Sequence, residues 1–125
     1  MPKVTVHRKA HFNSAHRLYR KDWSNEKNFE VFNKCSNPNF HGHNYELIVS
    51  LTGEIDPETG YVYDLGILKN YIKSEIEEAF DHKNLSVEVP EFDNLNPTAE
   101  NISVVIYGKL RKLLPQHLAL KVTLY

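Results

Sequence analysis

The stretch CSNPNFHGHNYELIVSLTGE, residues 35–54, decides how this chain folds and carries several of its most reactive side chains. From His43 onward apolar and polar residues alternate, which predicts a β-strand over 43–54 with one buried face. Side chains of a strand alternate between its two faces, so His41 and His43 point the same way, in phase with the apolar row. These two imidazoles supply half of a metal site, and Gly42 between them is expected to allow close approach of backbone or ligand.

A second strand with the same alternation is expected over residues 3–18. His16 shares the phase of its apolar residues and therefore points inward. A lone inward histidine is more often a hydrogen-bonded core residue than a ligand. Together with His41 and His43, however, it completes a set of three. Three histidines with a fourth position left open form the catalytic type of Zn²⁺ site. The alternative is that one histidine belongs to the core and the other two to the surface.

The rest of the chain predicts two helices, a further pair of strands and the loops between them, which together give an α+β fold. Two helices can cover one face of a small antiparallel sheet, and the final strand then forms an unprotected edge. The expected elements are a long irregular loop over 19–40, a turn over 56–60, a short third strand over 61–63, a helix capped by Asp64 to about residue 80, a loop over 86–97, a helix from Thr98 to Pro115, and a strand over 118–125.

Composition narrows the class of protein. A chain of 125 residues that is 41% hydrophobic and 25% charged is expected to form one globular domain, 1–125. Its net charge of −1, with both signs interleaved, argues against a nucleic-acid partner or an anionic membrane surface. One cysteine excludes an internal disulfide, and no apolar run approaches the roughly 18 residues of a membrane span. We therefore expect a cytoplasmic protein in a reducing compartment.

Further reactive side chains lie outside the strands. Cys35, six residues before His41, is a candidate base beside a metal or else a packed small residue. Asp81 and His82 form a possible proton relay, although a histidine at a helix C-terminus also stabilises the helix without catalysis. Thr98 and the neighbouring Glu100 have an ordinary interpretation as capping and first-turn residues, which the sequence alone favours.

Five separated motifs make the chain resemble the 6-pyruvoyl tetrahydropterin synthase family over nearly its whole length. They are FNSAHRL (12–18), KCSNPNFHGHNY (34–45), GEIDPETGYVYDLGILK (53–69), DHKNL (81–85) and NPTAEN (96–101). The resemblance implies the tunnelling fold, in which an antiparallel sheet carries two helices on one face. It also implies trimers whose sheets join into a β-barrel, two of which stack into a homohexamer with active sites at subunit interfaces.

The resemblance further implies a lyase that converts 7,8-dihydroneopterin triphosphate to 6-pyruvoyl tetrahydropterin with release of triphosphate, a step of tetrahydrobiopterin biosynthesis. On this basis His16, His41 and His43 match the zinc ligands. Cys35 matches the general base that removes a side-chain proton.

The remaining site assignments also come from the resemblance. Asp81 and His82 match an acid/base pair supplied by a neighbouring subunit. Thr98, with Glu100 beside it, lies in the segment that helps to line the pterin pocket.

Two other functions are compatible with the same motifs. One is a 6-carboxy-5,6,7,8-tetrahydropterin synthase of queuosine biosynthesis, which uses the same substrate; the five-residue spacer between Cys35 and His41 favours the pyruvoyl type. The other is a zinc-bound, pterin-binding homologue without catalysis. It is suggested because the family has a pterin-anchoring Glu after its last strand, and this sequence ends at Tyr125.

Overall fold

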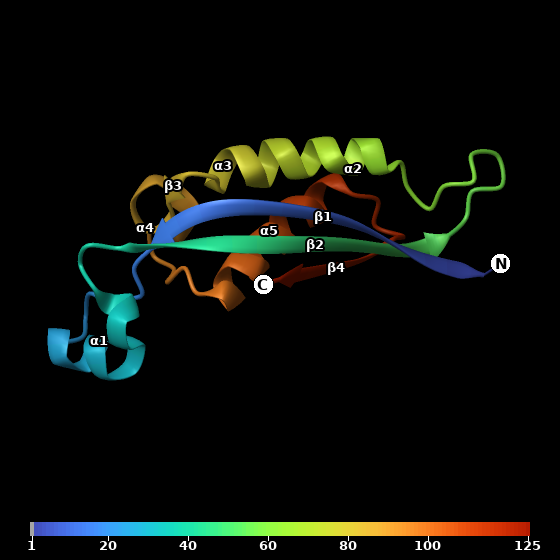
Figure 1. The fold of residues 1–125 in the computed structure, drawn as a ribbon. Coiled ribbons are helices and arrows are strands. Elements are labelled where there is room, and N and C mark those ends of the chain that lie inside the picture. The colour runs from blue at the N-terminus through green and yellow to red at the C-terminus, as the bar shows by residue number, and fades with distance from the viewer. Residues whose placement is uncertain (1) are drawn as a thin grey trace.

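A computed structural model describes residues 2–125 and shows a four-stranded sheet with helices packed against it (Figure 1). The strand order is β3-β1-β2-β4. Strand β2 pairs antiparallel with both β1 and β4, whereas β3 runs parallel to β1. The strands are β1 (Lys3–His16), β2 (His41–Glu54), β3 (Lys83–Asn84) and β4 (Ala119–Leu124). The predicted α+β class is confirmed.

The two long strands set the two faces of the sheet. In their register Phe12 lies opposite Tyr45 and Ala10 opposite Leu47, so these side chains share one face. All four are buried, and they continue the alternation that the sequence predicted. The strands differ from the expected ranges only at their ends, because β1 ends at His16 and β2 begins at His41.

Two long helical segments cover the apolar face. The first is α2 (Leu65–Ile72), which continues through a π-helical turn (Lys73–Glu77) into α3 (Glu78–Phe80); the second is α5 (Ala99–Leu113). Both begin at their predicted caps, where Asp64 and Thr98 accept hydrogen bonds from backbone N–H groups. Their buried residues are Leu68, Ile72, Ile76, Phe80, Ile102, Ile106 and Leu110. Burial of each such side chain contributes about 1.5–3 kcal/mol to folding.

Three sequence predictions on the connecting segments were wrong. Residues 61–63 form no strand, because Val62 and Tyr63 pack against the core and Asp64 starts the helix at once. The expected loop over 86–97 contains α4 (Leu85–Glu88) and a 3₁₀ turn (Pro90–Phe92). The predicted turn over 56–60 is confirmed, and Gly60 adopts the positive φ of 78° that the turn requires.

The third wrong prediction concerns residues 19–40, which hold α1 (Asn25–Phe32) and a 3₁₀ turn (Asn33–Ser36) instead of an irregular loop. These elements form a lobe at one end of the sheet (Figure 1). Ser24 caps α1 by accepting the Lys27 N–H. Helical periodicity did not reveal α1 because its buried anchor, Asn28, is polar.

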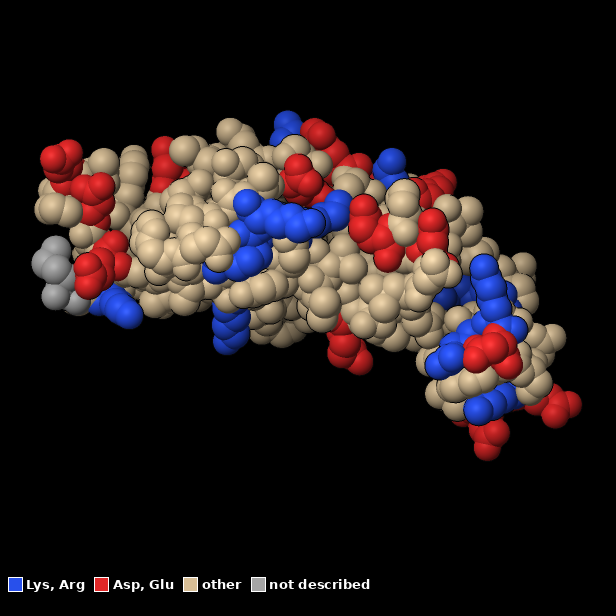
Figure 2. All heavy atoms as spheres, turned by 180° about the vertical axis from the view of Figure 1, so that it is seen from behind, with Lys and Arg blue, Asp and Glu red and all other residues tan. Residues whose placement is uncertain are grey.

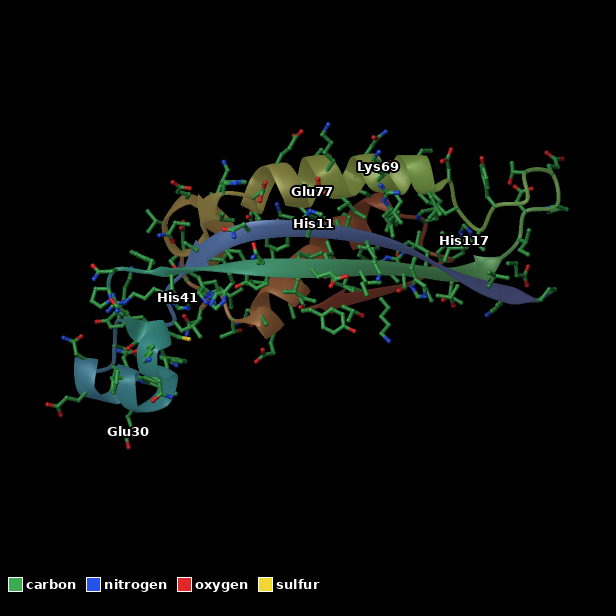
Figure 3. All side chains as sticks on the ribbon, in the orientation of Figure 1. His11, Glu30, His41, Lys69, Glu77 and His117 are labelled. Carbon is green, nitrogen blue, oxygen red and sulfur yellow. The ribbon has the colours of Figure 1, made fainter. Side chains whose placement is uncertain are left out.

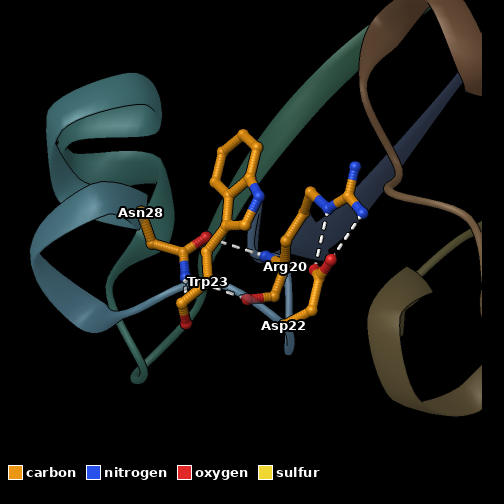
Figure 4. Close-up of polar contacts among 4 residues, drawn as sticks. All are labelled: Arg20, Asp22, Trp23 and Asn28. Carbon is orange, nitrogen blue, oxygen red and sulfur yellow. Dashed lines mark hydrogen bonds and ion pairs between the residues drawn. The ribbon is translucent and has the colours of Figure 1, made fainter.

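Asn28 holds this lobe together from within (Figure 4). Its side chain is 1% exposed, and its carbonyl oxygen accepts the Arg20 N–H at 2.7 Å. Its amide nitrogen donates to the Arg20 and Ser24 carbonyl oxygens at 3.0 and 3.1 Å. The ring of Trp23 stacks on Phe32 with centroids 5.8 Å apart. A buried polar side chain thus stabilises this lobe, whereas buried apolar side chains stabilise the rest of the fold.

The surface carries both signs of charge. Figure 2 shows Lys and Arg interspersed with Asp and Glu over the face seen from behind. This mixture agrees with the balanced composition of the sequence. Among the helices of residues 2–125, none is both long enough and apolar enough to cross a membrane.

Candidate metal centre and active site

Three histidines meet at the end of the sheet nearest the α1 lobe. His16 is the last residue of β1 and lies opposite His41, the first residue of β2. His43 follows on the same face of β2, and Figure 3 shows His41 at this end of the sheet. Ring centroids of the three are 4.5–4.7 Å apart, with planes inclined at 71–83°. Strand pairing therefore brings together two residues that lie 25 positions apart in sequence.

The ring nitrogens are spaced as a metal site requires. One ligand atom from each histidine lies within 4.8 Å of the others, and the Nε2 atoms of His16 and His41 are 3.1 Å apart. Two nitrogens that each lie 2.0–2.1 Å from a tetrahedral ion are about 3.3 Å apart. His16, His41 and His43 thus form a group able to hold a metal ion with little rearrangement.

The protein also favours the neutral imidazoles that bind metal. Burial lowers the pKa of His16 below its ordinary value of 6.5, and the neighbouring His43 and His41 lower it further, against the opposing effect of the Pro97 carbonyl. Burial and then His43 lower the pKa of His41. His16 Nδ1 lies 2.8 Å from the Pro97 carbonyl oxygen, which can only accept. Nδ1 therefore carries the proton, and Nε2 keeps its lone pair for a metal.

Access to the cluster differs from one histidine to the next. His16 is buried, His41 is half-buried and His43 is exposed, so one side of the cluster is open to solvent. No protein backbone approaches Gly42 closely, since an added Cβ would meet Asn13 and Ser14 only at ordinary contact distances of 3.8 and 4.0 Å; the close approach of a ligand stays a prediction.

Cys35 lies close to this cluster. It is half-buried in the 3₁₀ turn after α1, and its carbonyl oxygen accepts the Leu18 N–H at 2.7 Å. The Tyr45 hydroxyl lies 3.4 Å from His16 Nδ1. Burial, and secondarily the neighbouring Cys35, raise the pKa of Tyr45 to about 12. Tyr45 thus lies near both His16 and Cys35, and a common site for the thiol and the three histidines stays a prediction.

Asp81 and His82 form the expected pair at the end of α3. The Oδ1 atom of Asp81 accepts the Asn13 N–H at 2.8 Å, and its Oδ2 lies 2.9 Å from His82 Nδ1. The Asn13 N–H holds the pKa of the Asp81 carboxyl below its usual value, and His82 adds a smaller effect in the same direction. The His82 side chain is 84% exposed, so its other nitrogen is free to meet a partner from outside.

This pair lies at the outer edge of β1, where the Asp81 carboxylate and the His82 N–H bind the Asn13 backbone. Asp81 and His82 line a groove with His11, Asn13 and Glu46. Those three strand residues alternate with the buried row, so they face away from the core, whereas His16 shares the buried row. Within residues 2–125, the pair has no hydrogen bond to His16, His41 or His43.

Thr98 and Glu100 have capping positions at the start of α5. The Thr98 hydroxyl oxygen accepts the Asn101 N–H at 3.1 Å, and Glu100 is exposed in the first turn. A role for either in binding substrate stays a prediction.

Sequence reasoning missed Pro97 as the partner of His16. The sequence Asn96-Pro97 before the helix cap Thr98 indicates a turn. The contact of Pro97 with His16, however, spans 81 residues, and no local pattern reveals it.

The fold and the site together define a tunnelling-fold protein with a three-histidine centre and an adjacent thiol. The profile described as 6-pyruvoyl tetrahydropterin synthase matches residues 5–125. The chain belongs to the 6-pyruvoyl tetrahydropterin synthase family, and like its relatives it is an enzyme of the lyase class.

Individual relatives support this membership. The 6-pyruvoyl tetrahydrobiopterin synthase of Pongo abelii is 48% identical over 123 residues, which are 98% of this chain and 85% of that protein. The solved structure of Caenorhabditis elegans 6-pyruvoyl tetrahydropterin synthase is 36% identical and superposes with a TM-score of 0.88, over 100% of this chain and 96% of that one. A more distant relative, 32% identical over 95% of this chain and 85% of that protein, is named dihydroneopterin monophosphate aldolase in Pyrococcus furiosus.

Proposed function

We propose that this enzyme converts 7,8-dihydroneopterin triphosphate to 6-pyruvoyl tetrahydropterin and releases triphosphate. The observation that carries the proposal is the convergence of His16, His41 and His43 beside Cys35 in a chain of this family. The pterin-binding role of Thr98 and Glu100 belongs to the same proposal, and it rests on the family resemblance.

The three histidines would hold a Zn²⁺ ion. The three imidazole donors, the His16 tautomer set by Pro97 and the open side next to His43 suit a catalytic zinc site. When bound, Zn²⁺ supplies a Lewis acid that polarises an oxygen of the substrate side chain and makes the neighbouring C–H protons more acidic.

The chain's own groups then move protons. Cys35 acts as the general base that removes a proton from the substrate side chain. His82, held at Nδ1 by Asp81, transfers a second proton through its exposed Nε2. The triphosphate leaves with its bonding electrons, and hydrogen passes from side chain to ring. The overall elimination therefore balances without an external oxidant or reductant.

The separation of the two catalytic parts supports an assembly with active sites between subunits. Asp81 and His82 lie at the outer edge of β1 and have no hydrogen bond to the three histidines within residues 2–125, which supports a site where a neighbouring chain brings its own pair to each metal centre. Strand β4 forms an edge of the sheet along which another sheet can pair. We assign a homohexamer of two stacked trimers, each with its sheets joined into a barrel.

Product analysis tests the reaction. Incubation with 7,8-dihydroneopterin triphosphate should release triphosphate and give a product of the mass of 6-pyruvoyl tetrahydropterin. The Cys35→Ala variant should keep its zinc and lose turnover. Trapping of acetaldehyde would show the carboxy-forming reaction instead, and a two-carbon aldehyde cut from a monophosphate substrate would show the aldolase reaction. Binding of the pterin without formation of any product would support the non-catalytic alternative.

Mixing two inactive variants tests the shared site. Cys35→Ala and His82→Ala chains are purified, mixed in mild denaturant and reassembled. Because one chain still supplies the thiol and the other the acid/base pair, mixed assemblies should regain part of the parent activity. Each variant reassembled alone is the control. Mixed assemblies as inactive as these controls would mean that both groups act within one chain.

A further inference from the structure

The segment Asn96–Asn101 makes a closed set of hydrogen bonds around one carbonyl group. The backbone oxygen of Asn96 accepts both the Thr98 N–H and the Asn101 side-chain amide, each at 2.8 Å. Thr98 in turn accepts the Asn101 N–H through its hydroxyl oxygen at 3.1 Å. These bonds fold the chain sharply at Pro97, just before α5 begins. Since Pro97 has no N–H and a fixed φ, the turn has little freedom left.

This turn aims the Pro97 carbonyl at the metal cluster. Pro97 is buried, and its oxygen lies 2.8 Å from Nδ1 of the equally buried His16. The side chain of Asn96 reaches the same strand end, because its Oδ1 accepts the Tyr19 N–H at 3.1 Å. Between these two contacts Leu18 donates to the Cys35 carbonyl. The turn at Pro97 thus contacts both His16 and Tyr19, at the start of the segment that leads to Cys35.

We infer that Asn96 and Asn101 are positioning residues of the metal centre. Asn101 holds the turn that presents the Pro97 carbonyl to His16, and Asn96 fixes that turn to the backbone just beyond His16. Together they keep the His16 proton on Nδ1 and direct Nε2 toward the metal. The inference rests on the proposed metal site, and it gives the NPTAEN motif a role other than contact with the substrate.

The Asn101 side chain is a hydrogen-bond donor and the Asn96 side chain is an acceptor, so the same substitution should affect them differently. The Asn101 side chain donates to a carbonyl oxygen, so an aspartate at 101 cannot replace it and places a negative charge against that oxygen. The Asn96 side chain accepts from an N–H, so an aspartate at 96 keeps the bond. The same Asn→Asp change should therefore weaken metal binding at 101 and spare it at 96.

The first experiment measures Zn²⁺ affinity by competition with a chromophoric chelator at pH 7.5. Loss of a group that orients a metal-binding histidine typically lowers affinity 10–100-fold. We expect a loss of about this size for Asn101→Asp and Asn101→Ala, and a smaller loss for Asn96→Ala. Asn96→Asp should bind like the parent. Asn94→Ala, at an exposed position of the same loop, is the matched control and should also bind like the parent.

A second measurement does not need metal or activity. In the metal-free protein, long-range ¹H–¹⁵N spectra report which ring nitrogen of each histidine carries the proton. His16 should be protonated at Nδ1 in the parent and in Asn96→Asp, and should shift toward the Nε2 tautomer in Asn101→Asp. Circular dichroism shows whether each variant has kept its fold before either measurement is interpreted.

The outcomes separate this inference from the proposed function. Parent-like zinc affinity and an unchanged His16 tautomer in folded Asn101→Asp would overturn the positioning role while leaving the zinc site in place. An equal loss for both Asn→Asp variants would also overturn it, because it would show a general effect of charge. Failure of the parent itself to bind zinc would instead refute the metal site on which the inference rests.

Discussion

Replacement of Asn28 by alanine should open the α1 lobe while leaving the sheet intact. Asn28 is 1% exposed and makes four hydrogen bonds through its side chain, two of them to the backbone N–H and carbonyl of Arg20 (Figure 4). The Ser24 carbonyl keeps another partner, the Asn28 N–H. The Arg20 carbonyl likewise keeps the Trp23 N–H at 3.2 Å, so the substitution leaves mainly the Arg20 N–H without a partner.

The expected magnitude follows from this unpaired N–H and from the three bonds that the Asn28 amide nitrogen no longer donates. An unpaired buried donor or acceptor costs about 1–3 kcal/mol, and water entering a small lobe relieves part of that cost. Alanine also recovers roughly 0.5 kcal/mol of helix propensity relative to asparagine. We expect the lobe to lose about 2 kcal/mol of local stability, which corresponds to an increase of about 30-fold in its open population.

Hydrogen exchange followed by mass spectrometry measures this population. Amides of residues 17–36 should exchange about 30-fold faster in Asn28→Ala, while those in the centre of β1 and β2 should be unchanged. Asn25→Ala is the matched control, because Asn25 is exposed on the same helix and has only a weak 3.4 Å contact with Tyr19. Unchanged exchange in the lobe, or equal acceleration across both strands, would refute the anchoring role of Asn28.

Three further predictions concern acid stability, metal binding and the core. The folded-state pKa of Asp81 lies below its unfolded value of 3.8, so its stabilisation is present above that pH and is lost as the pH falls through the folded pKa. Its side chain is 40% exposed, so Asp81→Asn should reduce the acid dependence of urea unfolding by only about 0.5 kcal/mol. Because burial lowers the pKa of His16, metal affinity should be nearly flat from pH 8 to 6.5 and fall below that. Titration with Co²⁺ as the probe ion, followed by its absorbance, measures this affinity at each pH. A loss of affinity that begins above pH 7 would contradict the prediction. Ile106→Ala should cost about 3 kcal/mol in urea unfolding, whereas Val104→Ala, 66% exposed on the same helix, should cost under about 0.5 kcal/mol.

Most of the fold follows from local pattern. Alternation located β1 and β2 to within two residues, and helical spacing with the caps Asp64 and Thr98 located the two helices. The failures have separate causes. Residues 61–63 look like a strand but lack a partner, and α1 is held by the polar Asn28 and not by an apolar stripe.

The metal cluster was predictable because it obeys the period of a strand. His41 and His43 share a face by alternation, and His16 shares the phase of its own apolar row. The assignment of Cys35 needed the family resemblance, since spacing alone permits a thiol near His41 without requiring it. In the structure, Cys35 lies near Tyr45, whose hydroxyl is 3.4 Å from His16 Nδ1, and the role of Cys35 as a base stays a prediction.

The sequence by itself thus determined which side chains face the core, where the strands and long helices begin, and which three histidines can meet. Those properties depend on the period of each element and on its capping residues, which act within a few positions. Only the tertiary structure decided that Pro97 fixes the tautomer of His16, that Asp81 and His82 lie against Asn13 at the edge of β1, and that Asn28 anchors the lobe. These are contacts of single atoms, and apart from the local Asn28 anchor they join segments far apart in the chain. Their existence depends on the register and packing of the whole sheet, which no local pattern of residues encodes.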